Sequence, residues 1–396
     1  MKRINAVLII ILLVVMAGCG EKQSTDELIT VDVTKSYPKK ELILQDFLDV
    51  EYILLDDIND DFITNSSTIY HVGKEYILTR NTGISGDLFL FGRSGTGLRV
   101  INRRGASGEE YQMLAGALLD EENNELIIRD TNNKGLVYDL YGVFKRRFAF
   151  EGDYAAGRIF NFNRDNYIWH KDISSREDER VAFRIISRYD GSTTKEIQIP
   201  FERKLTRQLV DVSHPSGIAN GPVNQVLIPN RNSFVLTEFS SDTIYQLFPD
   251  YRMIPFMVRT PSVQSMDPEI FLYPSVLTDR YYFMQTVQKT VYSRNEAGDR
   301  TYPRHNLVYD RQEKSLFEYV VYNDDFSTKR QVTMAFETHM FLPFSNNEIA
   351  FINKLESYEL VEAYKKGELK DGKLKDLVAT MNEESNPVIM VAKHRK

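Results

Sequence analysis

Cysteine is almost absent from this chain, whose 396 residues contain a single one at position 19. A domain with one cysteine cannot form an internal disulfide, so we expect its core alone to hold the fold. No hydrophobic stretch after residue 19 is long enough to cross a membrane, and no Gly/Ser linker divides the chain. These absences favour one continuous architecture after residue 19.

Motifs for catalysis and metal binding are also missing. The chain has no Gly-x-Ser-x-Gly nucleophile elbow. Six histidines are scattered without the spacing of metal ligands: His71, His170, His214, His305, His339 and His394. The sequence therefore predicts no metal and no cofactor, and it offers no catalytic residues.

The N-terminus has the pattern of an export signal. Lys2 and Arg3 precede an apolar run of 11 residues, 6–16, and small residues then lead to Cys19. A membrane-spanning helix needs about 20 apolar residues, so this run fits a signal peptide over residues 1–18 instead. The alternative is an ordinary signal peptide followed by a free cysteine.

The same pattern resembles bacterial lipoprotein signals. That resemblance implies cleavage before Cys19 and acylation of this residue, which would attach the protein to membrane lipid. We expect an outer-membrane lipoprotein of a Gram-negative bacterium, facing the periplasm or the cell surface. Acidic residues soon after Cys19 resemble a surface-export signal. The alternative interpretation is that they belong to a solvated tether.

The charge of the chain is mildly acidic. Its formal net charge is −7, and removal of Lys2 and Arg3 with the signal peptide makes it −9 (−7 − 2). This balance argues against a nucleic-acid partner. Our prediction is a monomer.

Aromatic residues and short apolar runs dominate the rest of the chain, which has 22 Tyr and 23 Phe. The runs have the length of strands and are separated by turn residues. Six leading strands recur at intervals of roughly 40 to 70 residues, which is typical of propeller blades with insertions. They lie near Ile77, Ile127, Ile168, Val235, Tyr282 and Ile349. The predicted fold is therefore all-β, a six-bladed β-propeller.

Residues 357–381 are the only stretch with a helical pattern. Gly367 and Gly372 weaken that pattern and would split it in two. We expect a small helical insertion in the last blade, followed by a final strand over 387–391. A strand near 51–55 should complete a blade and latch the ring. The predicted domains are a flexible tether over 19–40 and a propeller over 41–396.

Three segments resemble a known family, the six-bladed β-propeller lipoproteins that carried a domain-of-unknown-function label and are related to NHL-repeat propellers. They are the Gly-rich turn over 102–111, which ends in Glu-Glu-Tyr, the opening strand over 42–55, and the closing strand over 386–390. The resemblance covers almost the whole chain after the signal peptide. It implies the propeller fold and an envelope location, and it implies no activity.

Three residues are candidate ligand contacts. Trp169 and His170 follow an apolar strand start, where a tryptophan at the propeller mouth could stack on a sugar. A tryptophan in the core between blades is the alternative. Arg104 precedes a glycine-containing loop that could present N–H groups to an anion, and a structural turn is its alternative. The leading functional hypothesis is a non-catalytic binding or scaffold module for a protein partner or a glycan. The second is an enzyme of lyase, lactonase or glycosidase type with its site in the central funnel.

Overall fold

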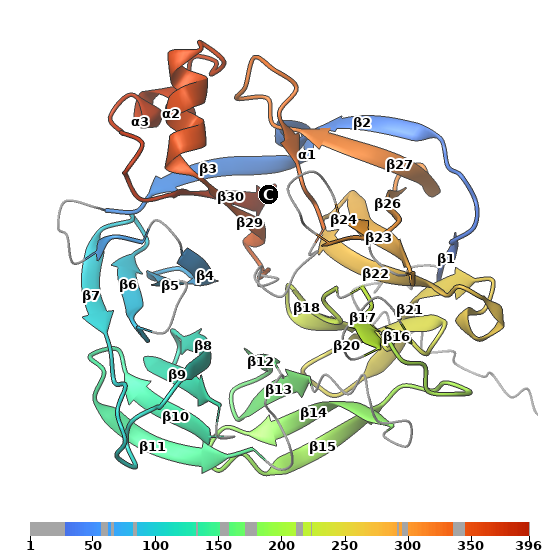
Figure 1. The fold of residues 1–396 in the computed structure, drawn as a ribbon, viewed down its shortest axis with the longest axis horizontal. Helices are drawn as coiled ribbons and strands as arrows, with labels where there is room; N and C mark the ends of the chain where they lie inside the picture. The colour runs from blue at the N-terminus through green and yellow to red at the C-terminus, as the bar shows by residue number, and fades with distance from the viewer. Residues whose placement is uncertain are drawn as a thin grey trace, which may run out of the picture.

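A computed structural model describes most of the chain after residue 27. The described residues are 28–56, 62–64, 67–81, 85–131, 134–150, 158–170, 180–210, 217–222, 224–290, 293–294, 300–335 and 345–395. They form six sheets arranged as blades around a common centre (Figure 1). The fold is a six-bladed β-propeller, and the predicted all-β class is confirmed.

The first three blades are regular four-stranded antiparallel sheets. Blade 1 contains β4 (Ser67–Val72), β5 (Tyr76–Asn81), β6 (Leu88–Gly92) and β7 (Gly97–Ile101). Blade 2 contains β8 (Leu114–Asp120), β9 (Glu125–Asp130), β10 (Lys134–Asp139) and β11 (Phe144–Ala149). Blade 3 contains β12 (Arg158–Asn161), β13 (Asn166–His170), β14 (Val181–Ser187) and β15 (Thr193–Gln198). In each blade the first strand lies near the centre and the last at the rim (Figure 1).

The last three blades incorporate strands from the N-terminal segment. Blade 4 contains β18 (Leu227–Asn230), β19 (Ser233–Leu236), β20 (Thr243–Leu247) and β21 (Met253–Thr260), with β1 (Ile29–Asp32) at its edge. Blade 5 contains β22 (Ile270–Leu277), β23 (Tyr281–Gln288), β26 (Arg304–Asp310) and β27 (Ser315–Tyr322), with β2 (Lys39–Ile43) and β28 (Gln331–Val332) beside β27. Blade 6 contains β29 (Ile349–Leu355), β30 (Val388–His394) and β3 (Leu48–Leu54).

The middle strands of the blades are apolar on both faces because each blade packs between two neighbours. In β9, for example, Leu126, Ile127 and Ile128 are all buried. Leu126 and Ile128 pack with residues of blade 1, whereas Ile127 packs with Trp169 of blade 3. The core is therefore divided into clusters between neighbouring blades, which explains why the strands read as apolar runs.

The N-terminal segment forms a belt along the outside of blades 4 to 6. β1 pairs in parallel with β21, and β2 pairs in parallel with β27. The flexible tether predicted over 19–40 is therefore wrong from Ile29 onward. The physical reason lies in the alternation of Ile29, Val31 and Val33, whose buried side chains pack against blade 4 and blade 5.

The ring is closed by strands from the two ends of the chain. β3 runs antiparallel to β30, in a register from Leu48 opposite His394 to Leu54 opposite Val388. The predicted latching strand and the predicted final strand are both present here. Short additional elements complete the described fold: α1 (Leu44–Phe47), η2 (Val263–Ser265), and the pairs β16 (Gln208–Val210) with β17 (Ile218–Asn220) and β24 (Ser293–Arg294) with β25 (Arg300–Thr301).

The helical insertion lies between β29 and β30 of blade 6, as expected. It contains α2 (Ser357–Lys365) and α3 (Lys373–Val378). Gly367 has φ +70° and Gly372 has φ +150°, values that residues with a side chain rarely adopt, so the chain turns here between the two helices. Buried Leu360, Leu369 and Leu374 hold the insertion against Phe326, which follows β27.

Substitution of Val31 tests whether the belt is part of the fold. Val31 is 0% exposed in β1, so Val31→Ala should lower the free energy of unfolding by about 2 kcal/mol. Val100→Ala, at a partly exposed position of the rim strand β7, is the matched control and should leave stability unchanged. Denaturant titration measures both variants, and equal stabilities would show that β1 is only a tether.

Candidate functional site

The two faces of the propeller carry different connections. In an antiparallel blade, the turns between first and second strands and between third and fourth strands lie at one end, which we call the turn face. The connections from blade to blade lie at the opposite end. The helical insertion also lies there, because Phe326, just after β27, forms a bridge with Leu369. We call this end the insertion face.

The Gly-rich segment over 102–111 is a blade-to-blade connection between β7 and β8. The buried Tyr111 hydroxyl donates to the Gly86 carbonyl at 2.6 Å and accepts from the Arg103 N–H at 3.0 Å. Glu110 accepts from the Ser107 N–H at 2.9 Å, and this hydrogen bond lowers the pKa of its carboxyl. The loop is thus held by its own side chains and backbone, as a structural turn would be.

The three candidate ligand residues have separate surroundings. Trp169 is 1% exposed and packs between blades 2 and 3, so protein covers both faces of its ring. His170, at the end of β13, lies against Phe183 with ring centroids 5.1 Å apart. Arg104 is exposed in the β7–β8 connection, and its Nε donates to the Gln112 carbonyl at 3.1 Å. Trp169 thus occupies the core position between blades, which was the alternative to stacking on a sugar.

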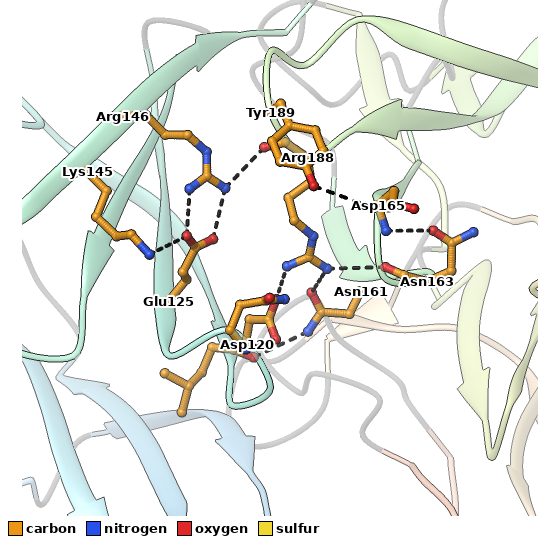
Figure 2. A network of polar contacts seen from close by, with 11 residues as sticks. Asp120, Glu125, Lys145, Arg146, Asn161, Asn163, Asp165, Arg188 and Tyr189 are labelled. Atoms are coloured by element: carbon orange, nitrogen blue, oxygen red, sulfur yellow. Dashed lines mark hydrogen bonds and ion pairs between the residues drawn. The ribbon is translucent and has the colours of Figure 1, made fainter.

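A group of ionic side chains bridges blades 2 and 3 at the turn face (Figure 2). Arg188, in the turn between β14 and β15, forms an ion pair with Asp120 at the end of β8, and each side chain is 5% exposed. Its other amino group donates to Asn161 at 3.4 Å and to the Asn163 carbonyl at 3.3 Å. The guanidinium also lies over the Tyr167 ring, 4.6 Å from its centroid.

A second ion pair continues the same seam. Glu125 accepts hydrogen bonds from Arg146 at 2.6 and 2.8 Å and from Lys145 at 2.6 Å. Burial raises the pKa of this carboxyl, but the two cations outweigh it and hold the pKa below its ordinary value. Arg146 also donates to the Arg188 carbonyl at 3.3 Å (Figure 2). Because the charges satisfy one another, this seam joins blades and presents no free acid–base pair.

A similar contact joins blades 1 and 2. The Glu121 carboxylate accepts from the backbone N–H groups of Lys74 and Tyr76, both at 2.9 Å, and lies 3.1 Å from His71 Nε2. Burial raises the pKa of Glu121, but His71 and the N–H groups outweigh it and lower the pKa to about 2. A side chain at Gly73 would collide with this carboxylate and displace it from its present contacts.

The described residues hold no group of three or more His, Cys, Asp or Glu side chains placed to bind a metal. Of the six histidines, His394 is buried at the end of β30, and burial lowers its pKa to about 4. His214, His339 and Cys19 lie outside the described residues. Within that part of the chain, no helix is both long and apolar enough to cross a membrane.

A cavity of about 150 Å³ opens on the insertion face, between the segment after β27, the end of β29 and α2. Its lining is mixed. Apolar side chains come from Phe326, Val332, Leu355, Leu360 and Met390, and polar ones from Asn323, Arg330, Gln331, Asn353, Lys354, Glu356 and Glu359. The cavity therefore offers a ligand both apolar surface and hydrogen-bonding groups.

The cavity is held in shape by hydrogen bonds and ion pairs. The buried Asn323 donates to the Tyr52 hydroxyl at 2.8 Å and accepts from Gln45 at 2.7 Å. On the rim, Arg330 forms an ion pair with Glu359 of α2, and Lys354 lies 2.8 Å from Glu356. The Arg330–Glu359 pair thereby fixes the helical insertion to the segment that follows blade 5. Sequence reasoning missed this site because its residues come from three distant segments without a shared motif.

The sequence profile of a family described as "6-bladed beta-propeller" matches residues 20–341. The chain belongs to this family. The resemblance seen in the 102–111 turn and the opening strand is therefore confirmed at the level of the fold. A search of the curated proteins finds no match to this six-bladed propeller.

Three solved structures are similar to this chain at low sequence identity. A protein of Bacteroides fragilis NCTC 9343 that is thought to be exported is 14% identical, with a TM-score of 0.60; the match covers 93% of this chain and 100% of that one. A streptogramin B lyase is 8% identical with a TM-score of 0.35, covering 72% of this chain and 96% of its own. The Pan2 WD40 domain of Neurospora crassa is 12% identical with a TM-score of 0.35, covering 68% and 75%. The Bacteroides protein supports the fold, and at 14% identity it shows no activity for this chain.

The seam in Figure 2 predicts a large effect of removing one charge. Asp120→Asn leaves the Arg188 guanidinium buried without its carboxylate, which should lower the free energy of unfolding by about 3 to 5 kcal/mol. Lys365→Met removes an exposed pair with Glu383 and should leave stability unchanged. Denaturant titration compares the two variants. A small loss in Asp120→Asn would mean that this pair is solvated.

Glu121 should make stability depend on pH. Its pKa falls from an ordinary 4.5 to about 2 on folding, so its contribution is fully present above pH 4.5 and disappears as pH falls through about 2. The contribution is about 3 kcal/mol. Glu121→Gln should remove this part of the acid dependence in unfolding curves recorded at a series of pH values. Glu122→Gln, at an exposed neighbour, is the control, and identical curves for both variants would refute the assignment.

Proposed function

We propose that this propeller is a membrane-anchored, non-catalytic binding module of the bacterial cell envelope. Its ligand is a glycan, and one sugar residue of that glycan enters the cavity on the insertion face. The observation that carries the proposal is the cavity itself, with its apolar walls and amide, carboxylate and guanidinium groups in one small space.

The size and chemistry of the cavity favour a single sugar ring. A cavity of 150 Å³ has room for one ring-sized group. A pyranose has hydroxyl groups around its rim and C–H groups on its faces, so it needs both kinds of lining. Gln331 and Asn353 can donate to and accept from hydroxyl groups, while Phe326, Leu360 and Met390 can cover an apolar face.

The envelope location is supported by the N-terminus. The apolar run over 6–16 followed by Cys19 resembles a lipoprotein signal, and the similar Bacteroides protein is thought to be exported. Acyl chains on Cys19 would hold the propeller at a membrane, with the belt beginning ten residues later at Ile29 (29 − 19 = 10). Radiolabelled palmitate incorporation that is lost in Cys19→Ser tests this part of the proposal.

A glycan panel tests the binding function. The soluble fragment from Glu21 onward should bind at least one glycan, measured by thermal shift and then calorimetry. The double variant Gln331→Ala and Asn353→Ala removes hydrogen bonds worth about 1 kcal/mol each, so affinity should fall about tenfold or more. Gln312→Ala is the matched control. It lies in the turn before β27, at the opposite end of the strand that leads to the cavity.

Three outcomes contradict the proposal. The first is that no glycan binds, and the second is that the cavity variant binds as tightly as Gln312→Ala. The third is that the bound glycan is cleaved, which would replace the non-catalytic function by the lyase or glycosidase alternative.

A further inference from the structure

The rim of the propeller is covered unevenly. The rim strands β21 and β27 each have a belt strand added in parallel, β1 and β2. Blades 1 to 3 end instead at β7, β11 and β15, and in the described part of the chain no strand pairs with their outer edges. A propeller rim of this sequence can therefore accept an added strand. In the described part of the chain, the outer edges of blades 1, 2, 3 and 6 have no such strand.

The open rim of blades 1 and 2 carries an excess of positive charge. Residues 97–111 and 140–149 contain six cations and two acids, in a chain with an excess of acids. We call the six cations the basic rim; they are Arg99, Arg103, Arg104, Lys145, Arg146 and Arg147. Three of them, at 145, 146 and 147, are consecutive residues of the edge strand β11.

Three of the six cations of the basic rim are held by backbone carbonyls. Lys145 and Arg146 share Glu125. Arg99, Arg103 and Arg147 donate instead to the backbone carbonyls of Leu140, Gly142 and Gly108. Of the two acids, Glu110 lies near enough to Arg103 for the charge to lower its pKa. The guanidinium groups are therefore held in place by neutral acceptors and retain a net positive charge.

Exposed apolar residues lie beside these cations. Tyr141 is 68% exposed and Val143 is 57% exposed in the turn before β11, and Leu98 and Val100 are exposed on β7. Arg99 lies over the Tyr141 ring, 4.1 Å from its centroid. A hollow of about 600 Å³, lined by Ser107, Gly108, Glu109, Phe144, Arg146 and Arg147, adjoins β11. Exposed apolar groups next to a strand edge and a hollow are features of protein interfaces.

We propose that the edge of β11 binds an extended, acidic segment of a partner protein, which adds to blade 2 as a further strand. Backbone hydrogen bonds along β11 give affinity, and acidic side chains opposite Lys145 and Arg147 select the partner. The belt shows the same arrangement inside the molecule, since Lys39 of β2 lies opposite Glu318 of β27. This surface is separate from the cavity on the insertion face, so it adds a partner to the proposed function.

A protein partner fits this surface better than the membrane to which the chain would be anchored. The belt enters the ring at blade 4 through β1, and β11 lies on the other side of the ring (Figure 1). If Cys19 is the anchor, β1 is the described strand closest to it in sequence, so we assign the opposite rim to a protein partner.

Two synthetic peptides test the proposal directly. A short peptide of alternating glutamate and valine should bind the soluble fragment from Glu21 onward, measured by fluorescence anisotropy, and salt should weaken it. The matched lysine–valine peptide should not bind. Amide hydrogen exchange should slow in β11 and not in β15 when the acidic peptide is present, because pairing protects the edge that it covers.

Charge reversal distinguishes binding at the basic rim from attraction by the net charge of the whole protein. Arg103→Glu with Arg147→Glu should weaken the acidic peptide about tenfold or more. Arg203→Glu with Lys195→Glu makes the same charge change on blade 3 and its connection to blade 4 and should leave affinity within about twofold. Circular dichroism checks that both double variants remain folded.

Several outcomes overturn the proposal. They are the absence of peptide binding, equal weakening in the two double variants, and exchange protection elsewhere than β11. Binding of the same fragment to vesicles of anionic lipid is measured last. If vesicles bind and the peptide does not, the basic rim is a membrane-binding surface. None of these results depends on the glycan cavity.

Discussion

The structure depends on one joint, the pairing of β3 with β30, which connects the two ends of the chain. Neighbouring blades of a ring are separate sheets with no strand pairing between them, so contacts of side chains alone would have to close the ring. β3, which comes from the N-terminal segment, pairs with β30 in the last blade. The ring can therefore open only if the hydrogen bonds between these two strands break. β1 and β2 extend the same principle to blades 4 and 5.

Buried charge supports the ring at its turn face. The Asp120–Arg188 pair and the Glu121 contact both cross from one blade to the next, where apolar clusters alone would allow blades to slide. A buried ion pair has a definite geometry, and removing one partner is far more costly than removing an exposed one. The same saturation means that these carboxylates are not available for acid–base chemistry. The two binding sites that we propose lie elsewhere, on the insertion face and at the rim.

The sequence predicted the ring because its signal is repeated. Apolar strands recur at blade spacing, and helical periodicity interrupted by two glycines marks one insertion, so the fold class and the split helix at 367–372 followed from pattern. β1 escaped prediction because it is four residues long and its partner, β21, lies more than two hundred residues away. The alternation of Ile29 and Val31 is too short to predict by itself that these side chains are buried.

The sites were harder to predict than the fold. The sequence around Trp169 would be the same if its side chain faced the central funnel or a neighbouring blade. Only the structure distinguishes the two positions. The cavity joins the segment after β27, the end of β29 and α2, and no residue spacing brings these together before the blades are built. The basic run in β11 is visible in the sequence, but its place on an open edge requires the order of the strands.

Hydrogen exchange along the N-terminal segment tests the central claim most directly. If the belt closes the ring, amides of β1, β2 and β3 should exchange as slowly as those of their partners β21, β27 and β30, because each pair opens together. Exchange of residues 29–54 at the rate of an unstructured tether, with the blades still protected, would contradict the account and show that the ring is closed by packing alone.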